Sequence, residues 1–145
     1  MRHEAGQLKE KLKKLIWRWG PALVMMALIF KVSSLSAAQV PNFGLWDLLV
    51  KKSSHMLGYA LLGAAYLHAL ANGRRISVRF IVLAVVGACL FAMTDEYHQS
   101  FVSGRHSTIV DVMIDTSGAA LGAAGAYFIQ TLARPARPRP PSTLQ

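Results

Sequence analysis

The sequence has little cysteine and few acidic residues. Its 145 residues include one cysteine, Cys89, which excludes an intrachain disulfide and a zinc site built from cysteine pairs. Seven acidic residues stand against 16 lysines and arginines, so the net charge is +9 with histidine neutral. There is no glycine-rich phosphate loop, serine nucleophile elbow, internal repeat or heptad pattern. A small basic soluble domain and a membrane protein remain as the two possible classes.

Apolar residues are abundant and make up 53% of the chain. They gather in four stretches of helical length with almost no charge, at residues 19–30 with an extension over 32–35, 56–71, 80–94 and 109–132. A helix needs about 20 residues to cross a bilayer core, or fewer where flanking side chains snorkel. Gly118, Gly122 and Gly125 in the fourth stretch would weaken a soluble helix but allow close helix packing in a membrane. The sequence therefore predicts an all-α membrane protein, a compact four-helix transmembrane bundle.

The placement of charge predicts the orientation of this bundle. Twelve of the 16 lysines and arginines precede the first stretch, lie between the second and third, or follow the fourth. By the positive-inside rule these regions are cytoplasmic, so both termini are predicted inside the cell. The surplus positive charge then has a membrane explanation, and no nucleic-acid partner is needed. Five of the seven acidic residues fall at the opposite ends: Asp47, Asp95, Glu96, Asp111 and Asp115.

The chain divides into a basic cytoplasmic segment (1–18), a transmembrane domain (19–132) and a Pro/Arg-rich cytoplasmic tail (133–145) that we expect to be disordered. Ser36-Ala37-Ala38 imitates a signal-peptide cleavage site, but Lys31 interrupts the region and cleavage would remove one crossing, so we expect this stretch to remain. Aromatic and aliphatic residues over 41–50 predict a short interfacial helix in the first external loop. We expect His68 in the core, and His98 and His106 on loop surfaces.

Short polar motifs interrupt the apolar stretches at their outer ends. Lys52-x-x-His55 precedes the second stretch, Glu96-x-x-Gln99-x-Phe101 closes the third, and Gly104-Arg105 leads into Asp111-Val112-x-x-Asp115-x-x-Gly118-Ala119-x-x-Gly122. In this order and spacing the motifs resemble the VanZ-like family, small bacterial membrane proteins named for a member associated with resistance to the glycopeptide teicoplanin. The resemblance covers residues 20–132. It implies a multi-pass protein of the bacterial cytoplasmic membrane.

The chain departs from the family pattern at three positions, with Lys51 in place of aspartate, Ser103 in place of proline and Asp115 in place of asparagine. Asp115 follows Asp111 by one helical turn, on the same face and about 6 Å further along the axis. Two ionised carboxylates there would repel, so one is protonated or a cation lies beside them. Thr108-x-x-Asp111 has the form of a helix capping box. We expect Asp115 to face the interior, neutral or paired with Lys52, His55 or Arg105.

Seven polar residues lie at or near the outer ends of the second, third and fourth stretches. We expect them to converge there in one ligand site. They are Lys52, His55, Glu96, Gln99, Arg105, Asp111 and Asp115. Lys52 and Arg105 suit a phosphate or carboxylate, and His55 and Glu96 are the candidates for a general base or acid. In the structural alternative these groups snorkel or neutralise one another, with Asp47–Lys51 and Glu96–Arg105 as pairs. We predict no metal site and no cofactor.

Three functions stay open at this point. The first is a binding protein that takes an envelope lipid or glycopeptide-related ligand in an outward-facing pocket and influences glycopeptide susceptibility. The second is an intramembrane enzyme that acts on a lipid-linked phosphate or glycan precursor. The third is a proton- or ion-coupled carrier, which a buried, titratable Asp115 suggests. Turnover of a labelled lipid-linked substrate would favour the second, and stabilisation by lipid alone the first. The sequence determines neither the ligand nor the oligomeric state.

Overall fold

A computed structural model of the protein describes residues 2–133. Within this range it has four α-helices and no strand. They are α1 (Arg2–Ser33), α2 (Asp47–Ala71), α3 (Val78–Gln99) and α4 (Ile109–Leu132), with two short 3-10 helices, η1 (Ala37–Gln39) and η2 (Gly44–Trp46), between α1 and α2. The predicted all-α architecture is confirmed. The predicted tail lies outside the described residues except for Ala133.

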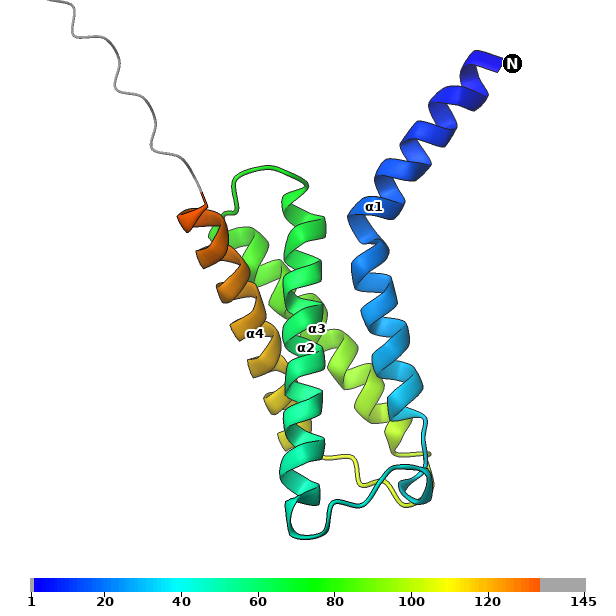
Figure 1. The fold of residues 1–145 in the computed structure, drawn as a ribbon, viewed down its shortest axis with the longest axis vertical. Coiled ribbons are helices and arrows are strands. Elements are labelled where there is room, and N and C mark those ends of the chain that lie inside the picture. Colours follow the sequence, from blue (N-terminus) through cyan, green and yellow to red (C-terminus); the bar gives the residue numbers. More distant parts are fainter. Residues whose placement is uncertain (1, 134–145) are drawn as a thin grey trace, which may run out of the picture.

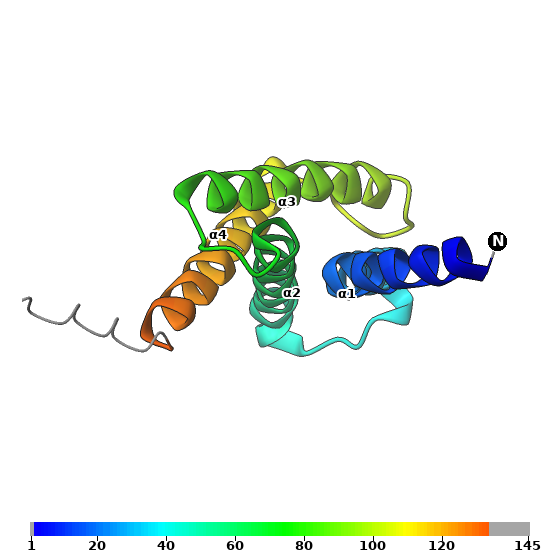
Figure 2. The ribbon, with the colours of Figure 1, turned by 90° about the horizontal axis from the view of Figure 1, so that it is seen from above.

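Consecutive helices run in opposite directions, so the connections alternate between the two ends of the bundle (Figure 1). One end holds the start of α1, the α2–α3 turn and the end of α4. The other end, which we call the loop end, holds the α1–α2 and α3–α4 connections. Seen from above, α2 lies between α1 and α4 while α3 covers one side, and α2 contacts all three helices (Figure 2). The predicted site residues therefore gather at the loop end, away from the basic start of α1.

Three helices are long and apolar enough to cross a membrane: Glu4–Ser33 of α1, Val78–Gln99 and Ile109–Leu132. Helix α2 is not among them, so the prediction of a four-helix transmembrane bundle is confirmed only in part. Its apolar half carries two tyrosines and one histidine. Because α2 is central and buries seven residues against its neighbours, it needs less lipid-compatible surface than the outer helices.

Two boundaries differ from those predicted. Helix α1 joins the basic segment and the first apolar stretch into one helix of 32 residues. Residues 41–50 form no separate α-helix, because η2 leads directly into α2 at Asp47. The Asp47 carboxylate accepts the Phe43 N–H at 3.2 Å and pairs with Lys51 at 2.7 Å, one turn later. The helix therefore begins well before its apolar part, and Asp47–Lys51 is a structural pair, as the structural alternative predicted.

Small residues let α2 and α4 approach closely. A Cβ atom added at Gly118 would overlap the carbonyl oxygen of Met56, and one at Gly122 would overlap that of Ala60. Both obstacles are backbone atoms, which cannot move aside as a flexible side chain does. Gly125 has nothing within 4 Å of its added Cβ, so it does not share this role. Close packing along this seam brings the start of α4 against the start of α2, where the site is built.

Candidate functional site

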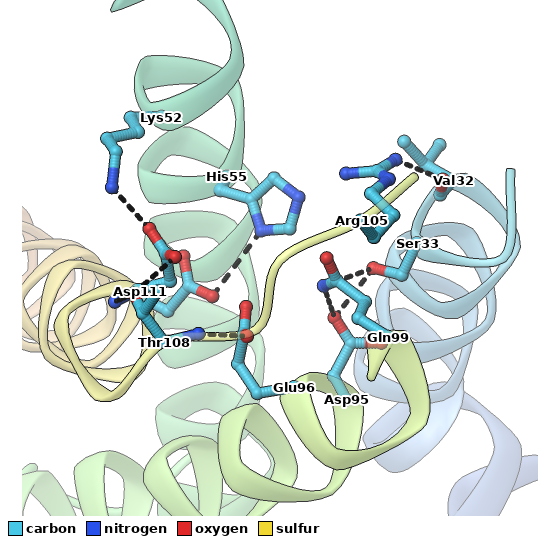
Figure 3. A network of polar contacts seen from close by, with 11 residues as sticks. Val32, Ser33, Lys52, His55, Asp95, Glu96, Gln99, Arg105, Thr108 and Asp111 are labelled. Carbon is cyan, nitrogen blue, oxygen red and sulfur yellow. Dashed lines mark hydrogen bonds and ion pairs between the residues drawn. The ribbon is translucent and has the colours of Figure 1, made fainter. Parts of the chain in front are cut away.

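A pocket of about 330 Å³ lies at the loop end of the bundle. Its walls come from α2, α3, α4 and the connection before α4, with Ala37, Val40 and Leu48 as apolar lining. All seven predicted site residues line it: Lys52, His55, Glu96, Gln99, Arg105, Asp111 and Asp115. Figure 3 shows six of them, labelled, on three helices and the connecting loop. The structure thus brings together motifs that lie far apart in the sequence.

The first ion pair of the pocket joins α2 to α4. Lys52 Nζ lies 2.5 Å from Asp111 Oδ1, and about a third of the Lys52 side chain is exposed. Asp111 is also part of the cap of α4, because its N–H donates to Thr108 Oγ1 at 3.3 Å and the Thr108 hydroxyl donates to Asp111 Oδ2 at 2.6 Å. In a capping box the side chain of Asp111 would also accept the Thr108 N–H. Here the Thr108 N–H donates instead to Glu96 Oε2 of α3, at 3.2 Å (Figure 3).

The second pair lies deeper. His55 Nδ1 is 3.4 Å from Asp115 Oδ2, and the Asp115 side chain is only 1% exposed. Asp115 thus faces the interior and has a histidine partner, in agreement with the expectation from its depth. Its other oxygen, Oδ1, is buried and has no hydrogen-bond partner in the described part of the chain. An imidazole held by a buried carboxylate has a defined orientation toward the pocket.

Arg105 fastens the α3–α4 connection to the end of α1. Its Nε donates to the Leu35 carbonyl at 3.1 Å and its Nη2 donates to the Val32 carbonyl at 3.2 Å. The Leu35 carbonyl lies just past the last residue of α1, and the Val32 carbonyl also accepts the Leu35 N–H at 3.2 Å, so the arginine holds the loop where the hydrogen-bond ladder of the helix ends. Within residues 2–133 no Glu96–Arg105 ion pair forms, and that structural alternative was wrong. Arg105 still lines the pocket.

A buried network beside the pocket was not predicted. Ser33 Oγ donates to Asp95 Oδ2 at 2.6 Å, and Gln99 Nε2 lies 3.1 Å from the same oxygen and 3.3 Å from Ser33 Oγ. All three side chains are buried and tie α1 to α3 (Figure 3). The spacing of Asp95 and Gln99 by one turn was visible in the sequence. Ser33 gave no signal, because its partner is 62 residues away.

Three other histidines, His68, His98 and His106, lie in three different settings. His106 is exposed and lines the pocket. His98, expected on a loop surface, belongs to the last turn of α3, where its ring stacks on Phe30 at 4.4 Å and lies 3.1 Å from Ser34 Oγ. His68, expected in the core, is exposed at the other end of the bundle. That expectation was wrong because α1 leans away from α2 at this end (Figure 1), where His68 lines an open groove.

The pocket offers balanced charge to a ligand. Its permanent cations are Lys51, Lys52 and Arg105, and its carboxylates are Glu96, Asp111 and Asp115. Among the described residues no cluster of three or more histidine, cysteine or acidic side chains has the geometry to hold a metal ion. The chemistry on offer is therefore hydrogen bonding and ion pairing with a polar group that carries donors, acceptors or both signs of charge.

Long apolar helices with a polar pocket at one end define a small helical membrane protein. The chain matches the VanZ/LLP1 family over residues 4–130 and belongs to that family, as its motifs indicated. No curated protein and no solved structure matches it. The family membership establishes a VanZ-type membrane protein.

Proposed function

We propose that the pocket binds the polar headgroup of an envelope lipid at the outer face of the bacterial cytoplasmic membrane and thereby influences susceptibility to teicoplanin-type glycopeptides. One observation carries the proposal: seven charged or amide side chains from three helices and a loop line a single pocket at the loop end. The basic segments gather at the opposite end, so the positive-inside rule directs the pocket outward.

The size of the pocket favours a headgroup over a whole glycopeptide. Its volume of about 330 Å³ lies at the lower end of the range for small-molecule sites, roughly 300 to 1,000 Å³. A glycopeptide antibiotic is too large for such a space and would insert only a part of itself. A lipid headgroup fits, and its acyl chains would remain in the bilayer beside the helices.

The charges of the pocket also suit a headgroup. Lys52 already contacts Asp111, but an ammonium has three donors and can share them with a phosphate. Arg105 uses Nε and Nη2 for the end of α1, and its Nη1 remains for a bound oxyanion. Glu96 and the helix-four carboxylates can accept hydrogen bonds from amino or hydroxyl groups. A phosphate with an amine or sugar attached would use both sets.

The test is a mass-spectrometric inventory of the lipids that co-purify with the full chain in mild detergent. We expect one headgroup class to be enriched over the composition of the membrane from which the protein was extracted. Lys52→Gln should lower that enrichment about tenfold, since it removes a charged contact of the kind worth about 1.5 to 3 kcal/mol.

Lys31→Gln is the matched control. Lys31 is exposed at the same end of the bundle and does not line the pocket, so this variant should keep the enrichment. In cells, Lys52→Gln should also change the inhibitory concentration of teicoplanin, while Lys31→Gln should not. A co-purified inventory that equals the bulk membrane composition would contradict the proposal.

A second candidate, an enzyme acting on a lipid-linked phosphate or glycan precursor, is favoured by the His55–Asp115 pair. A histidine oriented by a buried carboxylate is a common general base, and Glu96 on the facing helix can serve as the acid. Incubation with a labelled undecaprenyl-linked pyrophosphate tests this candidate. Turnover that His55→Gln abolishes while lipid enrichment persists would establish the enzyme and make lipid binding one of its steps.

A further inference from the structure

Helix α1 is longer than a bilayer core requires. Its 32 residues span about 48 Å against roughly 30 Å of hydrocarbon, so about 18 Å of helix remains. Pro21 lies inside the helix and has no N–H to donate to the Trp17 carbonyl. On the N-terminal side of this point α1 leans away from α2 (Figures 1 and 2). A groove opens between the two helices at the end opposite the polar pocket.

This groove has a volume of about 1380 Å³ and a strongly basic lining. Its five cationic side chains, against one acid, Glu10, are Lys9, Lys11, Lys13, Lys14 and Arg18. From α2 come His68 and Asn72, and the apolar lining includes Pro21 and Val24. The groove therefore combines positive charge with an apolar wall that continues into the first crossing.

Arg18 fixes the edge of the groove where α1 and α2 still touch. Its Nε donates to the Ala69 carbonyl at 2.5 Å, and its guanidinium lies 5.7 Å from the centre of the Trp19 ring. The two Nη groups carry further donors. The carbonyl end of α2 contributes only about half a negative charge, which the five cations outweigh.

We propose that this groove binds an anionic phospholipid of the leaflet at the basic end, independently of the outer pocket. Its phosphate would lie near Lys14, Arg18 and His68, and an acyl chain would follow Pro21 and Val24. A soluble anion would use the cations alone, whereas a phospholipid also covers the apolar wall. Basic pockets between membrane helices on the cytoplasmic side recognise anionic headgroups by this combination.

Trp17 provides the probe, because it lines the groove and is 78% exposed. The full chain carrying Trp19→Phe and Trp46→Phe keeps Trp17 as its single tryptophan. In phosphatidylcholine nanodiscs, acyl-brominated phosphatidylglycerol should quench Trp17 several-fold more strongly than brominated phosphatidylcholine at the same mole fraction. Equal quenching by the two lipids would overturn the proposal.

A charge-matched pair of variants separates a groove from general surface attraction. Lys11→Gln with Lys14→Gln removes two cations from the face of α1 that carries Arg18 and should lower the preference for phosphatidylglycerol about tenfold. Arg75→Gln with Arg79→Gln removes the same charge at the same end, outside the groove, and should leave the preference unchanged. An equal loss in both variants would assign the preference to surface charge and reject the groove.

Discussion

At the residue scale, Arg105 combines a structural contact with a place in the pocket. Its Nε and Nη2 reach two carbonyls at the end of α1, and a lysine ammonium cannot span both positions with planar geometry. We predict that Arg105→Lys lowers the free energy of unfolding by about 1 to 2 kcal/mol. Denaturation of the purified protein in mild detergent, followed by circular dichroism, measures the change.

The control for this prediction is Arg79→Lys. Arg79 is exposed at the opposite end of the bundle, so the change there should stay within about 0.5 kcal/mol. If Arg105→Lys is as stable as the unmodified protein, the two carbonyl contacts do not stabilise the end of α1.

Asp115 is the residue at which the carrier hypothesis can be tested. Asp115→Asn keeps the shape and leaves an amide oxygen that can accept from His55 Nδ1. We predict that the variant stays folded, within about 1 kcal/mol of the parent, and keeps its co-purified lipid. Thermal denaturation and the lipid inventory measure the two quantities. A folded variant that loses its effect on teicoplanin susceptibility would instead show that the ionised carboxylate drives chemistry or ion coupling, whereas a full effect would exclude the carrier.

The sequence predicted the residues of the site better than their contacts. Helical spacing placed Lys52 with His55 and Asp111 with Asp115, and these four residues form the two cross-helix pairs of the pocket. The partners of Arg105 could not be predicted, because they are backbone carbonyls, which every residue has. Its contacts depend on where the loop passes the end of α1, which only the fold determines.

At the element scale, the contact between α2 and α4 depends on glycine. Gly122 meets the Ala60 carbonyl, a backbone atom, while Gly125 on the same helix faces open space. We predict that Gly122→Ala destabilises the bundle by about 3 kcal/mol, because the helices must separate to admit the methyl group. Gly125→Ala should change stability by no more than about 1 kcal/mol. Titration with sodium dodecyl sulfate compares the two variants, and equal midpoints would refute the close contact.

Helix boundaries were predictable where polarity changes abruptly. Helix α4 has the bounds predicted for the fourth stretch, 109–132, because Thr108 caps its start. Helix α2 was predicted from residue 56 but begins at Asp47. The prediction used apolar composition, which identifies only the part of a helix that lies in lipid. The pair Asp47–Lys51 extends the helix beyond that part. The uncovered groove beside His68 was missed, since the tilt of one helix from another is not a local property of the sequence.

At the scale of the whole molecule, the two polar regions lie at opposite ends. His55 in the pocket and His68 beside the groove are both on α2, 13 residues apart, which corresponds to about 20 Å along the helix axis. This distance is shorter than the roughly 30 Å of a bilayer core, so the two histidines would lie near opposite edges of the core, one toward each leaflet. The two proposed lipid sites would consequently serve different leaflets and can be tested one at a time.

Orientation is the prediction on which both proposals depend. We replace Cys89, the single cysteine, with alanine and introduce either Ser103→Cys at the loop end or Arg75→Cys in the α2–α3 turn. Both positions are exposed. Position 75 is used rather than the nearby Gly73, because the φ of 76° at Gly73 disfavours any residue with a side chain. In intact cells a membrane-impermeant maleimide should label the Ser103→Cys variant and should label the Arg75→Cys variant only after lysis, because the positive-inside rule places the basic end in the cytoplasm. The reverse pattern would turn the polar pocket toward the cytoplasm, and labelling of both variants in intact cells would show that α3, the helix between the two positions, does not cross the membrane.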